Sequence, residues 1–323
     1  MESDWERRTP PIAPDHPLVA LRLARALPGA VLARARPLGG GLCNTNLALE
    51  LADGRTVVLR LHQREPRACR REAALLTRLA GVVPVPALLA VEPEPFDGGP
   101  PSLLLGFCPG RRLVDLPAAE VADGPGLGEA IGRVAAALHR TLAFETPGFL
   151  GDELAVVEPL GPGALLAYLR AALAGRAGAR LGADPTARLC AWIDAREEVF
   201  AAGERAPVLA HSDFKPTNLL VARRGEGWEV TALLDWEFAW AGPGLLDLGQ
   251  LLRHERELPP GFAAGVERGY LDGGGALPER WREAAAALDL LNLAGGFLDE
   301  AEERPRSQRD ARDLVLETLR RWP

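Results

Sequence analysis

The sequence predicts an α+β fold of two lobes, in which a small antiparallel sheet comes first and a mainly helical region follows. The 323 residues are more than one compact core usually holds, and 47% of them are hydrophobic, so two lobes can each bury a core. Alternating apolar residues and turn signals favour strands early in the chain, whereas Ala- and Leu-rich segments with helical spacing dominate later. We therefore expect a sheet lobe over residues 1–107 and a helical lobe over residues 108–323.

The composition of the chain limits which kinds of partner and which cellular compartment we expect for it. The net charge of −7 disfavours a nucleic-acid partner and would tolerate a cationic small molecule. The four cysteines form no Cys-x-x-Cys pair, which indicates neither a zinc site nor a disulfide scaffold and fits a reducing compartment. No apolar run approaches the ~20 residues that a membrane span needs. We expect a cytoplasmic protein that does not insert into membranes.

The first lobe is predicted to begin with a helix over residues 17–27, ahead of a glycine-rich segment. In that segment Gly39, Gly40 and Gly41 lie between two apolar stretches, where backbone amides can approach phosphates, although a triple glycine is also common in a plain hairpin turn. Strands predicted over residues 56–61, 88–91 and 102–107 complete a sheet of about five strands.

Two charged residues of this lobe are expected to meet. The period-2 pattern of residues 56–61 places Val57, Leu59 and Leu61 on one face and Arg60 on the other, toward the cleft. Residues 70–79 have helical spacing and carry Glu72, so this helix can pack on the sheet and present a carboxylate to Arg60. The alternatives are an exposed strand arginine and a solvated helix glutamate.

The stretch over residues 207–240 carries the densest set of polar groups. It contains His211-Ser-Asp213-Phe-Lys215-Pro-Thr-Asn218, then two short apolar strands joined by a turn at residues 224–227, and then Leu-Asp235-Trp-Glu237. A hairpin of this length brings Asp213, Asn218 and Asp235 to one end of a small sheet. Phosphoryl transfer needs such groups, because an aspartate orients and deprotonates the attacking hydroxyl while an amide oxygen and a second carboxylate hold Mg²⁺. Taken singly, each group is as well explained by a turn or a solvated carboxylate.

Together these motifs resemble the aminoglycoside phosphotransferase and choline kinase group of small-molecule kinases, which share the protein-kinase-like fold. The resemblance implies that Asp213 is the catalytic base and that Lys215 neutralises the γ-phosphate. It also implies that Asn218 and Asp235 hold Mg²⁺ and that Glu237, two residues after Asp235 on a continuing strand, reaches the metal or its waters.

The same resemblance implies a site for ATP or GTP in the first lobe. Gly40, Gly41 and Asn44 correspond to the glycine loop of choline-kinase-like enzymes. Arg60, paired with Glu72, stands where protein kinases carry a phosphate-gripping lysine. Gly106 and Cys108 lie where the hinge backbone reads adenine, a positional signal because any residue supplies main-chain groups.

Helical spacing predicts seven segments of the second lobe, residues 128–142, 163–173, 185–200, 245–257, 262–271, 278–299 and 306–321. On the first of these His139 is expected to be structural, and Asp247 corresponds in the family to an acidic residue that braces the catalytic loop. The residues beyond 250 carry no recognised motif and are expected to build the acceptor pocket.

The sequence thus predicts a kinase of a small-molecule hydroxyl. An aminoglycoside-type antibiotic or a similar amine-bearing acceptor is favoured, because Asp299, Glu300, Glu302 and Glu303 can face a cation, although they can equally form a solvated helix end. The alternatives are a metabolic kinase of an amino alcohol, amino acid or sugar, a non-catalytic nucleotide-binding pseudokinase, and a metal hydrolase using His211, Asp213 and Asp235.

Overall fold

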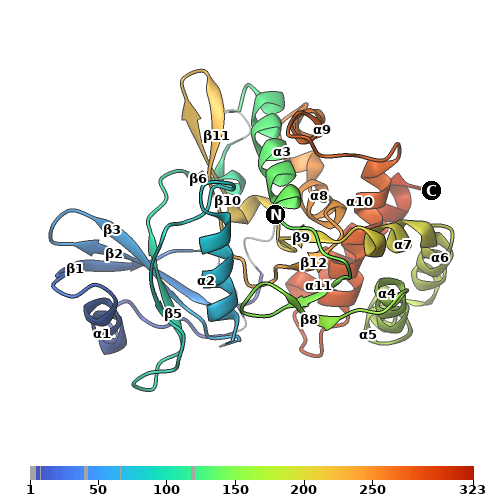
Figure 1. The fold of residues 1–323 in the computed structure, drawn as a ribbon. Coiled ribbons are helices and arrows are strands. Elements are labelled where there is room, and N and C mark those ends of the chain that lie inside the picture. Colours follow the sequence, from blue (N-terminus) through green and yellow to red (C-terminus); the bar gives the residue numbers. More distant parts are fainter. Residues whose placement is uncertain (1–4, 8, 40–42, 66, 118–120) are drawn as a thin grey trace.

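The computed structural model describes residues 5–7, 9–39, 43–65, 67–117 and 121–323, and it has two lobes side by side (Figure 1). The first lobe is an antiparallel sheet in the order β1-β2-β3-β5-β4, which confirms the predicted sheet. Its strands are β1 (Leu32–Pro37), β2 (Thr45–Leu51), β3 (Thr56–Leu61), β4 (Leu88–Glu92) and β5 (Ser102–Gly106). Helix α1 (Pro17–Ala26) and helix α2 (Ala68–Leu79) pack against this sheet.

The alternation in β3 decides how the sheet buries its side chains. Val57, Leu59 and Leu61 are buried in a cluster with the apolar face of α1, as predicted. Arg60 belongs to the opposite face, which α2 covers, so the strand delivers one charged side chain toward the second lobe.

The second lobe is mainly helical. Its helices are α3 (Gly124–Thr141), α4 (Ala164–Ala174), α5 (Arg176–Leu181), α6 (Ala183–Asp194), α7 (Glu197–Arg205), α8 (Leu245–Leu252), α9 (Phe262–Asp272), α10 (Trp281–Leu290), the π-helix η5 (Leu291–Leu298) and α11 (Pro305–Arg321). Its strands are β6 (Arg111–Arg112), β7 (Gly148–Leu150), β8 (Val156–Pro159), β9 (Val208–Ala210), β10 (Leu219–Arg224), β11 (Gly227–Leu233) and β12 (Trp240–Gly242). Short 3₁₀ turns lie at Leu113–Asp115, Pro216–Asn218 and Glu255–Glu257.

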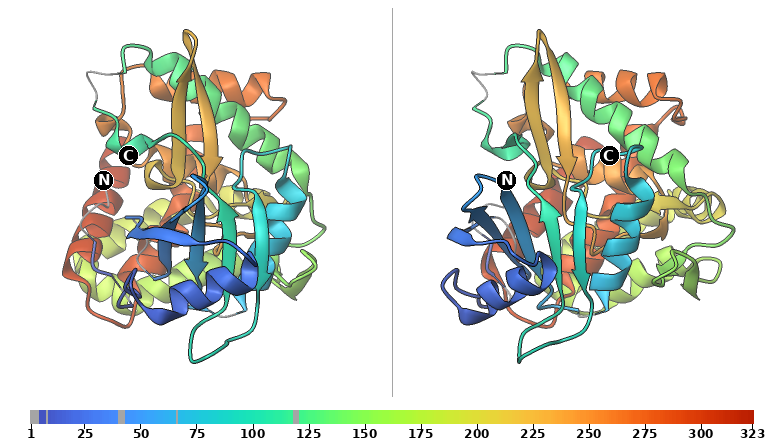
Figure 2. Two further views of the ribbon diagram at one scale, coloured as in Figure 1. Left: turned by 90° about the vertical axis from the view of Figure 1, so that its left-hand side faces the viewer. Right: turned by 60° about the vertical axis from the view of Figure 1, so that its left-hand side comes forward.

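The predicted hairpin is confirmed. β10 and β11 pair antiparallel from Leu219 opposite Leu233 to Arg224 opposite Gly227, and Gly225 takes the positive φ of 61° in the turn. Figure 2 shows this hairpin standing beside α3. Its other end therefore points into the interior, where the polar residues before and after it meet.

Three predicted helix boundaries are wrong. The segment 185–200 is two helices, because the chain leaves helical geometry at Arg196, whose guanidinium turns to the buried Glu283 at 2.7 Å. The segment 278–299 changes to a π-helix at Leu291, and the segment 245–257 ends as a helix at Leu252. The strands β7, β8 and β12 were not predicted, since three or four residues carry too little periodicity.

Helices α3 and α9 pack against each other behind the β10–β11 hairpin. They approach so closely that a Cβ on Gly128 would lie 2.1 Å from the Phe262 carbonyl oxygen, so only glycine allows this packing. The close packing keeps α3 in place and sets His139, near its end, against Asp247 of α8.

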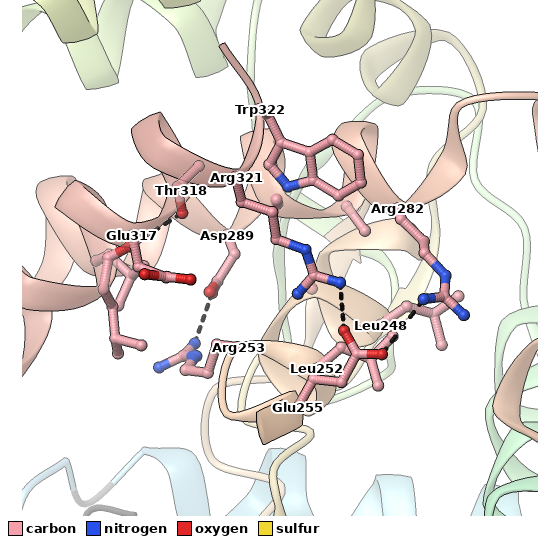
Figure 3. A pocket seen from close by; sticks show the side chains of 15 residues that line it. Leu248, Leu252, Arg253, Glu255, Arg282, Asp289, Glu317, Thr318, Arg321 and Trp322 are labelled. Atoms are coloured by element: carbon pink, nitrogen blue, oxygen red, sulfur yellow. Dashed lines mark hydrogen bonds and ion pairs between the residues drawn. The ribbon is translucent and has the colours of Figure 1, made fainter. Parts of the chain in front are cut away.

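A polar seam joins α8, α10 and α11 (Figure 3). It surrounds a cavity of about 50 Å³, and its charged groups satisfy one another: Arg253 donates to Asp289 at 2.5 Å, while Arg282 and Arg321 both pair with Glu255. These ion pairs attach the last helix to the rest of the second lobe, and each of the charged side chains named here has a partner. Across the described part of the chain, no helix is both long and apolar enough to cross a membrane.

Candidate active site

Residues 211–218, here called the catalytic loop after their predicted role, connect β9 to β10, and two of their side chains bind Asp213. The Asn218 amide nitrogen donates to Asp213 Oδ2 at 2.7 Å and to the Asp213 carbonyl at 2.9 Å. Lys215 Nζ lies 2.9 Å from Asp213 Oδ1. Because the amide nitrogen of Asn218 is turned to Asp213, its amide oxygen is left for another partner.

Asp247 on α8 braces this loop from behind. Its fully buried carboxylate accepts hydrogen bonds from the backbone N–H groups of His211 and Ser212, both at 2.8 Å, and contacts His139 Nε2 at 3.0 Å. Ser212 has a φ of 60°, a left-handed conformation that non-glycine residues rarely adopt. The two bonds to Asp247 fix this strained peptide, so Asp247 and His139 serve the structural roles expected of them.

Gln250 is a bracing residue that the sequence reasoning missed. Its side chain accepts from the Phe214 N–H at 2.9 Å and donates to the Ser212 carbonyl at 2.8 Å. Gln250 lies one helical turn after Asp247, and that i, i+3 spacing is the signal that could have identified it.

Arg60 joins the two lobes across the cleft. Its Nε donates to Glu72 at 2.9 Å and its Nη2 pairs with Asp235, so one buried guanidinium holds a carboxylate from each lobe. Burial acts to raise the pKa of Asp235, but the Arg60 guanidinium outweighs burial and holds that pKa below its usual value. Burial raises the pKa of Glu72 against the opposing effect of Arg60. Asp235 is therefore ionised at neutral pH.

Glu237 lies near Asp235, although not for the reason expected. The strand ends at Leu233 and Asp235 has a φ of 68°, so the chain turns and does not continue in extended form. Both carboxylates still line one cavity. Burial, helped by the Asp235 charge, raises the pKa of Glu237 to about 7. A cation placed between them would relieve this repulsion.

The donor chemistry here fits Mg²⁺. Arg60 engages Asp235 Oδ1, which leaves Oδ2, and Asn218 has its amide oxygen available, so two hard oxygen donors face the same cavity as Glu237. No cluster of three His, Cys, Asp or Glu side chains with metal-binding geometry occurs among the residues that the structure describes. The fit is to a metal that keeps several waters or binds together with phosphates.

The structure describes some, but not all, of the residues that were predicted to bind the nucleotide in the first lobe. Gly40 and Gly41 lie outside the described residues. Asn44 is buried, and its side-chain oxygen accepts from the Gln63 N–H at 3.0 Å, so it ties the start of β2 to the end of β3. The Gly106 N–H donates to the Ala87 carbonyl at 2.8 Å, and Cys108 follows it at the lobe junction.

A cavity of about 780 Å³ opens directly over the catalytic loop. Asp213, Asn218, Asp235 and Glu237 form its polar floor. Its walls are mainly apolar side chains from the four elements β7, α4, β12 and η5: Phe149, Leu165, Tyr168, Trp240, Leu291 and Phe297. The cavity thus joins a phosphate-handling set of groups to a large apolar compartment.

The π-helix shapes one wall of this cavity. A Cβ on Gly295 would lie 2.3 Å from the Tyr168 ring, so only glycine allows the ring to approach the helix this closely. π-Helical turns are rare and are found mostly at functional sites. Eight of residues 291–301 line the cavity, and that these residues build an acceptor pocket stays a prediction.

Two lobes joined at a hinge, with a braced aspartate at Asp213, an Arg60–Glu72 pair within the first lobe and an Arg60–Asp235 pair between the lobes, define the class of protein-kinase-like enzymes. A family model for the phosphotransferase enzyme family matches residues 34–287, so this chain belongs to that family and is a small-molecule phosphotransferase. The family resemblance seen in the sequence is thereby confirmed.

Solved structures share the fold. A thermostable mutant of aminoglycoside phosphotransferase APH(4)-Ia, in complex with AMP-PNP and hygromycin B, is 17% identical with a TM-score of 0.66, covering 92% of this chain and 96% of that one. Macrolide 2'-phosphotransferase MphH from Brachybacterium faecium is 23% identical with a TM-score of 0.63, covering 92% and 97%. A putative fructosamine-3-kinase from Thermobifida fusca is 22% identical with a TM-score of 0.59, covering 94% and 98%. No curated protein matches the sequence. The predicted two-lobed kinase-like fold is confirmed.

Proposed function

We propose that this chain is an ATP- or GTP-dependent kinase that transfers the γ-phosphoryl group to a hydroxyl of a small molecule. The observation that carries the proposal is the Asp213 carboxylate, held by Asn218 and Lys215 at the floor of a large cavity and next to the Arg60–Asp235 pair. Asp213 accepts the hydroxyl proton as the acceptor oxygen bonds to phosphorus and the bond to the nucleoside diphosphate breaks. Two of the structural relatives were solved with AMP-PNP or GDP, which supports nucleotide use.

The charges near the reacting phosphates come from fixed side chains. Arg60 is held by Glu72 and supplies positive charge from the first lobe, while Lys215 supplies it from the catalytic loop. Asn218, Asp235 and Glu237 would hold Mg²⁺, which supplies charge neutralisation to the transferring phosphates. An Asp235→Asn variant should therefore lose the magnesium-dependent part of its thermal stabilisation by ADP.

The walls of the cavity favour an acceptor with a large apolar face. Phe149 and Tyr168 are about half exposed and Phe238 is 37% exposed, so the free enzyme leaves aromatic surface open inside a site that a ligand can fill. Filling the site with an apolar body removes that surface from water, whereas a strongly hydrated acceptor gains nothing from it.

The carboxylates expected to bind a polycationic acceptor are already paired. Asp299 lines the cavity but accepts from the Arg176 N–H at 3.1 Å, and Glu300 lies 3.0 Å from Arg304 Nε. Glu302 and Glu303 pair with Arg304 and Arg180 and do not line the cavity. This weighs against an aminoglycoside with several ammonium groups.

A panel of acceptors tests the proposal. ADP release and the mass of the product would be measured with ATP and Mg²⁺ for a macrolide, which has an apolar ring and one amino sugar, and for an aminoglycoside, choline, ethanolamine, homoserine and a sugar. We expect the macrolide-like acceptor to have a kcat/KM at least about tenfold above the others, since each well-buried apolar group contributes about 1.5–3 kcal/mol. Transfer to the aminoglycoside alone would reject the acceptor class, and no transfer together with no nucleotide binding would reject the kinase.

A further inference from the structure

The chain near its amino terminus is attached to the second lobe. Trp5 is 6% exposed, its ring lies edge-on at 4.7 Å from that of Phe297, and its indole N–H donates to Asp310 at 2.7 Å. Glu6 accepts from the Arg306 N–H at 2.9 Å at the start of α11. Two consecutive side chains therefore bind the wall of the acceptor cavity and the last helix.

The next residues are attached to the first lobe. Arg7 donates to the Asn44 carbonyl at 2.8 Å and to the Thr45 hydroxyl at 3.2 Å. The Ile12 N–H also donates to the Thr45 hydroxyl, at 3.0 Å, and the Pro10 carbonyl accepts from Gln63 at 3.0 Å. These contacts lie at the start of β2, directly after the predicted glycine loop.

We propose that residues 5–7 and 9–12, here called the strap, form a further tie between the lobes that holds them closed around the nucleotide. The hinge after β5 and the Arg60–Asp235 pair connect the lobes at the hinge and across the cleft, and the strap adds a separate attachment that restricts the open states. Because apparent affinity is the intrinsic affinity multiplied by the closed, binding-competent fraction, the strap raises affinity without touching the nucleotide. Trp5 and Arg7 are thus positioning residues. This inference rests on the proposed binding of a nucleotide between the lobes.

The strap also borders the reacting groups. The Trp5 ring lies 5.8 Å from Lys215 Nζ, which in turn contacts Asp213. A loss of Trp5 could therefore act through Lys215 on the γ-phosphate. ADP separates the two effects, because it has no γ-phosphate for Lys215 to meet.

The experiment measures the dissociation constant of ADP with Mg²⁺ by calorimetry for Trp5→Ala, Arg7→Ala and the double variant. Trp228→Ala on the outer hairpin and Arg34→Ala on β1 are matched controls of the same residue types. We expect each strap variant to weaken ADP about fivefold or more, as a coupling between distant sites does. The double variant should be little weaker than the poorer single variant, since either change already releases the strap.

Two results of the calorimetry would contradict the proposed role of the strap. One is ADP affinity in Trp5→Ala equal to that of the unaltered protein, and the other is single effects that multiply in the double variant. If the unaltered protein binds neither ADP nor GDP, the proposed function fails, and the strap is then tested by small-angle scattering on the ligand-free protein. We then expect a larger radius of gyration in both strap variants than in the controls, and an unchanged radius would reject it.

Discussion

The floor and the walls of the large cavity are built in opposite ways. The floor comes from residues 211–237, and its charged groups have fixed partners, as in the pairs Asp213–Lys215 and Asp235–Arg60. The walls come from elements far apart in the chain, and Phe149 and Tyr168 are about half exposed. On the proposed function, the difference teaches that a short, preorganised segment sets the chemistry, whereas long-range packing sets which acceptor is selected.

The largest effect on the difference between floor and walls is expected when Asp213, the proposed base, is replaced. Asp213→Asn keeps the shape of the side chain but cannot accept the hydroxyl proton, so we expect kcat to fall about 10²–10⁴-fold while ADP affinity changes little. Steady-state kinetics and calorimetry on the same preparation check both parts. Asp272→Asn, at the end of α9, is the control, and an unchanged kcat in Asp213→Asn would remove this residue from the mechanism.

A second change tests whether the floor depends on its support. Both carboxylate oxygens of Asp247 accept hydrogen bonds from backbone N–H groups. Asp247→Asn replaces one of these oxygens with an NH₂ group, which cannot accept a hydrogen bond. We expect the free energy of unfolding to fall by about 2–3 kcal/mol, since these bonds go to a buried charged group. Denaturant unfolding measures it, and the folded variant should also have a lower kcat than Asp272→Asn. Full activity and stability of Asp247→Asn would show that the catalytic loop keeps its conformation without the bonds to Asp247.

A third change sharpens the role of the walls. Phe149→Ala removes exposed aromatic surface from the cavity without touching the floor, so we expect the KM for the acceptor to rise about 5–10-fold at nearly constant kcat. Phe96→Ala deletes the same side chain from the turn between β4 and β5 and should leave KM unchanged. If Phe149→Ala instead lowers kcat alone, the wall takes part in chemistry.

The smallest effect concerns pH and the first lobe. His62 is 1% exposed, and burial, aided by the nearby Arg60 charge, lowers its pKa to about 3. Its folded pKa lies below the unfolded value near 6.5, so the stability it contributes is complete above about pH 6.5 and is lost as the pH falls toward 3.

We therefore expect His62→Gln to reduce the pH dependence of the unfolding free energy by up to about 1.4 kcal/mol per pH unit between pH 6 and 4. Denaturant titrations at several pH values measure this slope. His16→Gln, at the exposed start of α1, is the control. An unaltered slope in His62→Gln would mean that this imidazole ionises in the folded state.

The sequence predicted the floor better than the walls for a physical reason. Asp213, Asn218 and Asp235 flank a single hairpin, whose register follows from local turn chemistry. The direction of the Arg60 side chain follows from the alternation along its strand. The left-handed turn at Asp235, the break at Arg196 and the π-helix at Leu291 depend on tertiary partners that periodicity does not encode. The aromatic walls meet only after the lobe has folded.

The most direct test of the division between floor and walls is the single-turnover rate of phosphoryl transfer at saturating ATP, Mg²⁺ and acceptor. We predict that Asp213→Asn lowers this rate at least about 100-fold and that Phe149→Ala leaves it within about twofold of the unaltered protein. Equal losses in the two variants would contradict the separation of chemistry from acceptor selection.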